Sequence, residues 1–420
     1  MYGFVRNFMT YDSRAGKAGT AELYYYVPLD RSLNAAGDDM NAYSTMKWAS
    51  LTSRIGLDAA WRDGDVDMKA KIETDFYSGL SGVTGTAAMR LRQAYFDVKY
   101  RELTLRAGQA WHPMAADMPD CIALEMAVPF GTFSRTPQVQ AIWNVTEHLS
   151  FTGAMLWQMQ YTSAGPEGAS ANYLKYSGIP EGYIGINFKS GAFLARAGVD
   201  CLSIKPRYKG EVMDADGTSY TAFVSDRLTD ILGFVYLQYK GNRFSAKVKS
   251  TFGEGGEHLN LHGGYGIAAK HTAPGEDGHY EYTPTLTSST WASFAYKCGK
   301  GFNAALLLGY IRSLGTEDDL MEVAEGSGLA EVGCHYLAKN TYANISSIAR
   351  VAPMVSWTYG PLTLALEYTV TAAQYGDYLS YTPSASGAKA LQCVGLDGLT
   401  SQNSHWVANH RLQFMTKFTF

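Results

Sequence analysis

The chain ends in Ala408-Asn409-His410-Arg411-Leu412-Gln413-Phe414-Met415-Thr416-Lys417-Phe418-Thr419-Phe420, an alternating stretch that closes on an aromatic residue. Side chains of a strand point alternately to its two faces. One face therefore favours hydrocarbon and the other favours water. The alternation alone is also compatible with the closing strand of a soluble sandwich, so the rest of the chain has to decide. The apolar face carries Leu412, Phe414, Phe418 and Phe420 beside the small Thr416, and the polar face carries Arg411, Gln413, Lys417 and Thr419.

Composition limits the classes of protein that this chain can be. The 420 residues contain no linker rich in proline or serine, so we expect one domain over residues 1–420. The longest apolar run, residues 304–311, is far shorter than the roughly 18 residues that a membrane-spanning helix needs. A net charge of -4 without a dense basic tract argues against nucleic acid as a partner. Abundant Gly (43) and Tyr (29) with only 18% charged residues favour many short strands.

Neither a disulfide framework nor a secretion leader is visible. The five cysteines are odd in number and lack CxxC spacing, so we expect unpaired thiols. No basic and apolar leader follows Met1, and we interpret the sequence as a mature chain whose signal peptide is absent.

Short turns and long polar segments alternate along the chain. The Asp-Gly of Arg62-Asp63-Gly64-Asp65 is a strong tight-turn signal. Six further short turns fall near residues 100–102, 146–148, 189–191, 240–242, 299–301 and 359–361. Seven short and eight long connections predict sixteen strands, an even number that lets an antiparallel barrel close without a free edge in lipid. The long segments are about residues 13–44, 77–87, 113–135, 162–179, 204–227, 254–285, 313–346 and 375–402.

Two further patterns favour an all-β transmembrane barrel. Residues 66–76 alternate five charged with six uncharged side chains, so one face of this strand is charged and the other is not. Aromatic residues also gather near the proposed short turns, as in the interfacial girdle of a membrane barrel. These aromatic residues are Trp61, Tyr100, Trp143, Phe188, Tyr239, Phe302, Tyr359 and Phe420.

Three short runs resemble a known family. Met89-Arg90-Leu91-Arg92-Gln93-Ala94-Tyr95-Phe96, Ala107-Gly108-Gln109-Ala110-Trp111 and Ser134-Arg135-Thr136-Pro137-Gln138-Val139 resemble the DcaP-like outer-membrane porins, over about residues 50–150. More loosely, the whole chain resembles the sixteen-stranded trimeric general porins. The resemblance implies a homotrimer in the bacterial outer membrane, with short periplasmic turns, long extracellular loops and one water-filled pore per subunit. It also implies that loop three, residues 113–135, folds into the lumen.

Basic residues predict the lining of one wall of the pore. Most of them alternate with apolar neighbours, and on the lipid face each would cost roughly 2–4 kcal/mol. Arg90 shares the phase of Arg92, but so does Phe96, which predicts a bulge or a subunit contact in that strand. The expected pore-lining basic ladder is Arg54, Lys69, Lys71, Arg90, Arg92, Arg106 and Arg135. Lys247 and Lys249 also face inward, but we expect them away from the constriction.

Loop three carries Asp117, Asp120 and Glu125. If the loop folds inward, these carboxylates would face the basic ladder across a narrow gap, and the surplus of Arg and Lys would favour small anionic solutes. The alternative is that the charges only solvate a wide lumen. This pattern favours passive diffusion of small hydrophilic solutes, with a preference for anions.

Other functions find less support in the sequence. We expect no enzymatic activity and no cofactor, since neither a Gly-Xaa-Ser-Xaa-Gly elbow nor a phosphate loop is present. His258 and His262 would share a strand face and are weak metal candidates, with a solvated external loop as the alternative. A barrel that only anchors an enzyme or adhesin in its long loops stays open. Expected partners are outer-membrane lipid and, through the terminal strand with Phe414, Phe418 and Phe420, the barrel-assembly machinery.

Overall fold

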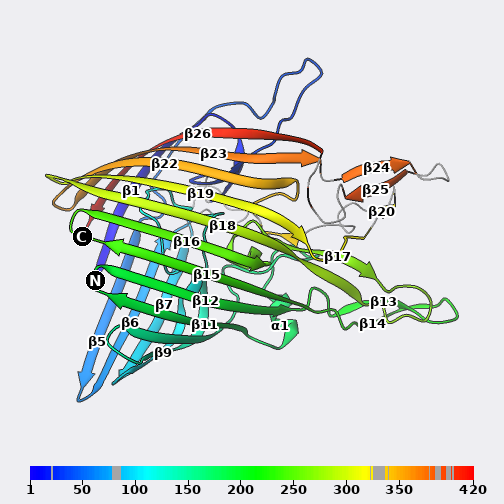
Figure 1. Cartoon of the computed structure of the whole chain (residues 1–420), viewed down its shortest axis with the longest axis horizontal. Coiled ribbons are helices and arrows are strands. Elements are labelled where there is room, and N and C mark those ends of the chain that lie inside the picture. The colour runs from blue at the N-terminus through cyan, green and yellow to red at the C-terminus, as the bar shows by residue number, and fades with distance from the viewer. Residues whose placement is uncertain are drawn as a thin grey trace.

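The chain forms a closed antiparallel barrel (Figure 1). The computed structural model describes residues 1–19, 22–77, 87–321, 323–324, 336–338, 340–377, 379–383, 389–393, 399 and 402–420. Strand β26 (Gln402–Thr419) pairs with β1 (Tyr2–Asp12), from Phe4 opposite Thr419 to Asp12 opposite Arg411, and this pairing joins the two ends of the sheet. The amino and carboxyl ends therefore lie together at one end of the barrel (Figure 1).

Within the described residues, sixteen strands build the wall, as the turn pattern predicted. The second of them is interrupted: both of its halves pair with β1, and Thr52 between them has a φ of 73°. In order, the wall strands are β1, the pair β4 (Thr45–Ala49) and β5 (Arg54–Asp63), β6 (Val66–Phe76), β7 (Met89–Tyr100), β8 (Leu103–Trp111), β9 (Arg135–Asn144), β10 (Leu149–Leu156), β11 (Glu181–Ser190), β12 (Phe193–Ile204), β15 (Leu228–Lys240), β16 (Phe244–Glu254), β18 (Tyr280–Gly299), β19 (Phe302–Thr316), β22 (Ile345–Tyr359), β23 (Leu362–Asp377) and β26.

The two ends of the barrel differ. All seven tight turns lie at the end that holds both termini, which we call the short-turn end. The longer connections leave the other end, where the hairpins β13–β14 and β24–β25 project beyond the wall (Figure 1). The short elements in these connections are β2 (Gly16–Gly19), β3 (Tyr24–Pro28), β13 (Lys209–Met213), β14 (Ser219–Phe223), β17 (Gly264–Lys270), β20 (Val323–Ala324), β21 (Tyr336–Leu337), β24 (Leu379–Pro383), β25 (Lys389–Cys393), helix α1 (Asn172–Ser177) and the 3-10 helices η1 (Pro113–Ala115) and η2 (Glu257–Leu259).

The outer face is apolar and exposed, as a lipid-facing surface has to be. On β26, Leu412, Phe414 and Phe418 are exposed, whereas Arg411 and Gln413 are buried in the interior. The terminal strand therefore has the two faces that its alternation predicted. The aromatic residues expected near the short turns are all exposed too, from Trp61 to Phe420. None of the helices in the described part of the chain is long and apolar enough to cross a membrane.

Three of the long connections send described segments into the barrel interior from the loop end: loop one (residues 13–44) through β2–β3, loop three (residues 112–134), and loop six (residues 255–279) through η2. Loop three was predicted to do so, but loop one was expected only as a polar segment. Its hairpin β2–β3 buries Tyr24, Tyr25 and Val27 inside the barrel. Val27 joins an apolar cluster with Phe130 of loop three and Leu259 of loop six. The run Leu23-Tyr24-Tyr25-Tyr26-Val27 is the sequence signal that this loop enters the barrel, because five consecutive apolar or aromatic residues are unusual in a solvent-exposed loop.

Candidate functional site

Loop three crosses the interior and is held by basic side chains of the opposite wall. Arg196 Nη1 of β12 lies 2.7 Å from Asp117 Oδ1, and Lys247 Nζ of β16 lies 2.9 Å from Asp120 Oδ1. The Ile122 amide donates to Glu367 Oε2 of β23 at 2.8 Å. Because these three anchors come from well-separated strands, they fix the loop across the barrel.

Glu125 of loop three is buried inside the barrel, with a side chain that is 1% exposed. Its Oε1 is 3.7 Å from Arg350 Nη1 and 4.0 Å from Arg411 Nη1. Arg350 Nη2 also donates to the carbonyl of Tyr25 in loop one at 3.0 Å, and Nη1 donates to the carbonyl of Val128 at 3.0 Å. Arg350 therefore joins loop one and loop three to β22.

The basic ladder pairs within its own wall. Arg92 reaches Glu73 at 2.8 Å and Asp75 at 2.7 Å, both on the neighbouring strand β6. The expectation that the loop-three carboxylates face this ladder is therefore wrong, since they pair with the opposite wall. The other ladder pairs are Arg54–Glu73 (3.4 Å), Lys71–Asp58 (2.9 Å), Arg90–Asp75 (2.8 Å) and Arg106–Asp97 (2.7 Å), while Lys69 is exposed.

A bulge in β7 explains the phase of Arg90. Gln93 lies opposite Glu73 and Leu91 opposite Thr74, so Arg92 is an extra residue in the ladder. The extra residue lets Arg90 and Arg92 both reach Asp75 inside the barrel while Phe96 stays exposed on the outer face. The predicted interruption of this strand is a bulge.

Arg135 differs from the rest of the ladder because it is fully buried without a carboxylate. Its Nη2 donates to Tyr161 Oη at 3.0 Å, and its guanidinium lies 4.7 Å from the ring of Trp111. Its Nε and Nη1 have no hydrogen-bond partner. Among the described residues no carboxylate lies within ion-pair distance of it, so Arg135 leaves an uncompensated positive charge beside the base of loop three.

The two lysines of β16 were expected away from the constriction, and that expectation is wrong. Lys249 Nζ donates to the carbonyl of Met114 and, at 3.1 Å, reaches Thr132 Oγ1, so it ties both ends of loop three to the wall. Lys247 contacts the middle of the loop through Asp120. Strand periodicity gives the face on which a lysine lies but not which loop covers that face.

A water-accessible cavity of about 370 Å³ lies between loop three and the short-turn end. Its wall is polar and apolar in about equal parts, and the two guanidinium groups of Arg106 and Arg196 border it. Pro113 and Ala116 of loop three form part of its lining, and Gln140 and Asn187 supply amide groups. Such a lining suits hydrated small solutes.

The two weak metal candidates are separated. His262 Nε2 donates to the carbonyl of Ile345 at 2.7 Å and Nδ1 accepts from Thr341 Oγ1 at 2.6 Å, and burial lowers the pKa of His262 to about 4. His258 instead lies beside Glu181 of β11 and Asp200 of β12, near His112 at the start of loop three. Both histidines are buried, so the solvated-loop alternative is wrong as well.

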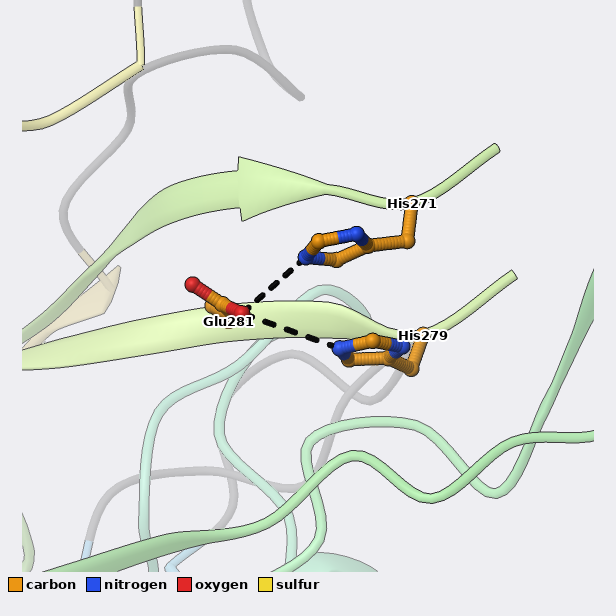
Figure 2. Close-up of side chains that lie close together, drawn as sticks. All are labelled: His271, His279 and Glu281. Carbon is orange, nitrogen blue, oxygen red and sulfur yellow. Dashed lines mark hydrogen bonds and ion pairs between the residues drawn. The ribbon is translucent and has the colours of Figure 1, made fainter. Parts of the chain in front are cut away.

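A second histidine cluster lies where loop six joins β18, and it is partly exposed (Figure 2). His271 Nε2 is 3.0 Å and His279 Nε2 is 3.8 Å from Glu281 Oε1, and the two rings stack with centroids 4.1 Å apart. The hydrogen bond to Asp277 raises the pKa of His279. Spacing in the sequence did not single out this cluster because the hairpin β17–β18 brings its members together.

Known proteins resemble this chain in structure. No family model and no curated protein matches the sequence. The outer membrane channel DcaP of Acinetobacter baumannii has the same fold, with a TM-score of 0.62 and 16% identity over 100% of this chain and 96% of that one. An anion-selective porin from Comamonas acidovorans (TM-score 0.55, 10% identity, 100% and 98% covered) and the trimer form of the outer membrane protein OmpT of Vibrio cholerae (TM-score 0.53, 10% identity, 100% and 98% covered) share it too. These likenesses confirm the sixteen-stranded porin fold.

Proposed function

We propose that this chain is a bacterial outer-membrane porin through which small hydrophilic solutes diffuse passively, with a preference for anions. The observation that carries the proposal is a closed barrel with an apolar exposed outer face and a charged interior crossed by loop three. Only closed barrels and helices satisfy every backbone hydrogen bond within lipid. Similar folds in outer-membrane channels and porins support the location and the class of activity.

The preference for anions rests on charges without carboxylate partners. Arg135 and Lys249 both contact the region of loop three, and neither is within ion-pair distance of a carboxylate in the described residues. Arg106 and Arg196 border the cavity below the loop but are paired with Asp97 and Asp117, so the preference does not rest on them. Fixed positive charge in a narrow, low-dielectric passage raises the local concentration of anions.

Planar-bilayer recording tests the channel directly. We expect ohmic current and a reversal potential that reports anion preference in a salt gradient. Lys71→Glu and Arg92→Glu should both shift the reversal potential towards cations. Lys71 is the cleaner position, because among the described residues its ammonium group pairs only with Asp58 and Tyr2, whereas Arg92 supports two buried carboxylates. The absence of any conductance contradicts the proposal, and unchanged reversal potentials would place the ladder outside the ion path.

The assembly proposed for the chain is a homotrimer. The trimer form of OmpT from Vibrio cholerae, which has a similar fold, supports it. The outer face around the interrupted strand is strongly apolar, with Met46 66% and Trp48 73% exposed, and offers a surface for subunit contact. Light scattering in mild detergent should give three chains per particle, and channels should close in three steps. A monomeric particle would contradict this assembly.

The terminal strand is also proposed to be the contact for the barrel-assembly machinery. Phe414, Phe418 and Phe420 are exposed on the outer face, and Phe420 forms two backbone hydrogen bonds with Gly3 at 3.0 Å. Deletion of Phe420 should therefore lower the amount of heat-modifiable barrel in the outer membrane. Normal assembly of this variant would contradict the proposal.

One observation favours a second function, a barrel that anchors an enzyme or adhesin. Loops one, three and six bury an apolar cluster inside the barrel, which narrows the interior at the loop end. The projecting β13–β14 and β24–β25 hairpins would then be the working surface (Figure 1). A folded protein without conductance but with hydrolase activity or cell binding would support this alternative over the porin.

A further inference from the structure

Six acidic and histidine side chains meet inside the barrel, at the place where loop six touches the wall. Glu181 begins β11, Asp200 and Asp230 lie on β12 and β15, and Glu257 and His258 belong to η2 of loop six. The sixth, His112, precedes η1 at the start of loop three. All six are at most 3% exposed. The proposed porin activity uses none of them.

Negative charge dominates this cluster. Four carboxylic acids meet two imidazoles, and in the described part of the chain no lysine or arginine lies within ion-pair distance of any of the four acids. Both oxygens of Asp230, both oxygens of Glu257 and Asp200 Oδ1 lack hydrogen-bond partners. Buried carboxylates without partners are costly, so the cluster needs either protons or a cation.

His258 points into the cluster without a hydrogen bond at either ring nitrogen. Its Nε2 lies 3.5 Å from Glu181 Oε1 and 3.7 Å from Asp200 Oδ2. Ligand atoms bonded at 2.0–2.2 Å to a tetrahedral zinc ion lie about 3.3–3.6 Å apart. Glu181 and Asp200 in turn each offer a carboxylate oxygen within 4.8 Å of the other. His258 Nε2 is therefore spaced from both carboxylates as a third ligand of one ion rather than as their hydrogen-bond partner.

His112 has a different part in the cluster. Its Nδ1 accepts the amide hydrogen of Met114 at 3.1 Å, so in the neutral ring the proton is on Nε2. Nε2 is 2.6 Å from Glu181 Oε1, which is a hydrogen-bond distance and too short for two ligands of one ion. His112 therefore orients Glu181, as hydrogen-bonded neighbours commonly orient a ligating carboxylate.

Space for additional ligands lies next to His258. A cavity of about 30 Å³ is lined by Glu257 and His258 together with Gln160 and Tyr161. A volume of this size holds about one water molecule, and water with the neighbouring Glu257 can complete a coordination shell.

We propose that Glu181, Asp200 and His258 bind one divalent first-row transition-metal ion, with zinc as the best fit. An imidazole with two carboxylates matches zinc better than calcium or magnesium, which prefer oxygen ligands alone. The site does not depend on the porin activity.

The metal would lock the constriction in place. It would tie loop six to β11 and β12. Loop six in turn supports loop three through two hydrogen bonds. The Phe133 amide donates to the carbonyl of Leu259 at 2.8 Å, and Asn260 Nδ2 donates to the carbonyl of Phe133 at 2.6 Å. Loss of the ion should therefore loosen loop three without opening the barrel wall.

The test uses the full chain, refolded in detergent without lipopolysaccharide, which itself binds divalent cations. After treatment with a chelator, the protein is equilibrated with zinc and the bound metal is measured by mass spectrometry. Because the partly exposed cluster in Figure 2 is a competing site for zinc, the parent protein carries His271→Gln and His279→Gln. We expect one zinc ion per chain in this parent and none after the further change His258→Gln.

Three further variants sharpen the test. His112→Gln should weaken zinc binding about 10- to 100-fold without abolishing it, as loss of an orienting partner does. Asp200→Asn should abolish zinc binding. His148→Gln, at an exposed short turn, should leave it unchanged. Cobalt bound to the parent should show the visible absorption of a nitrogen and oxygen site, and His258→Gln should remove it.

Two results would overturn the proposal. One is a folded parent, shown by its heat-modifiable band, that binds no zinc or cobalt, which would mean that protons neutralise the cluster. The other is full zinc binding by His258→Gln or by Asp200→Asn.

Discussion

The two walls of the barrel use their basic residues in opposite ways. On β5 to β8, most arginines pair with carboxylates of adjacent strands, as Arg106 does with Asp97 and Arg92 with Glu73. On β12 to β26, Arg196, Lys247 and Arg350 pair with carboxylates of loop three. The charges of the first wall are neutralised within the sheet, whereas those of the second wall hold loop three inside the barrel by ion pairs.

The difference shows that charge on a strand face does not by itself define a pore lining. A basic residue whose partner is in the wall adds little net field, whereas one whose partner is in a loop decides where that loop lies. Substitution of a basic residue on β12 to β26 should therefore make the loops inside the barrel more mobile. A matched substitution on β5 to β8 should not.

The largest effect is expected from Arg350→Met. It leaves Glu125 buried with Arg411 4.0 Å away and removes donors to loops one and three, and breaking a buried ion pair costs about 3–5 kcal/mol. Limited proteolysis should cut loop one faster, and single-channel conductance should rise. Arg90→Met is the matched control, because Asp75 keeps Arg92 as a partner and the loop contact that Arg90 makes is with the ring of Tyr77 at 3.9 Å, not with loop one or loop three. Equal cleavage of both variants would contradict the contrast between the walls.

Acid should loosen loop six on the second wall. The folded-state pKa of His262 is lowered to about 4 by burial, below its ordinary value of 6.5, so this group favours the folded state above pH 6.5 and that contribution is lost as the pH falls towards 4. The loss is roughly 2 kcal/mol at pH 5. Melting temperatures measured from pH 7 to pH 4 should fall less steeply in His262→Gln than in the wild type. Identical slopes would show that His262 does not titrate in this window.

Arg135→Gln and Arg92→Gln each remove one positive charge, but we expect only Arg92→Gln to lower the stability. Arg92→Gln leaves Glu73 and Asp75 short of a partner and should cost about 1–3 kcal/mol, whereas Arg135→Gln removes a buried cation that has no carboxylate. The melting temperature should fall only for Arg92→Gln. The reversal potential should move further towards cations in Arg135→Gln, since its charge is not compensated. The reverse order of these shifts would contradict the pairing pattern.

The smallest effect is expected from Asp117→Asn. Arg196 is 30% exposed, so this pair contributes at most about 1 kcal/mol. Open-channel noise should increase because loop three loses one anchor near the cavity. Asp97→Asn frees the other arginine of the same cavity but leaves the loop untouched, and its noise should match the wild type.

Much of the fold follows from local patterns. The alternation of residues 408–420 gave the two faces of β26, and the phase conflict between Arg92 and Phe96 predicted the bulge. The inward path of loop three came from family resemblance. Of the proposed metal site the sequence singled out only His258, and paired it with His262, because His112, Glu181, Asp200 and His258 come from four separate segments of the chain.

The sequence by itself determined the sixteen strands, their turns and the face on which each side chain lies, because a strand alternates with a period of two and a tight turn needs particular residues. Only the tertiary structure decided which charges meet. Partners such as Arg350 and Glu125 are separated by more than two hundred residues and come together only because the wall closes and the loops fold into it. Partner choice across a lumen depends on loop paths, which no local period encodes.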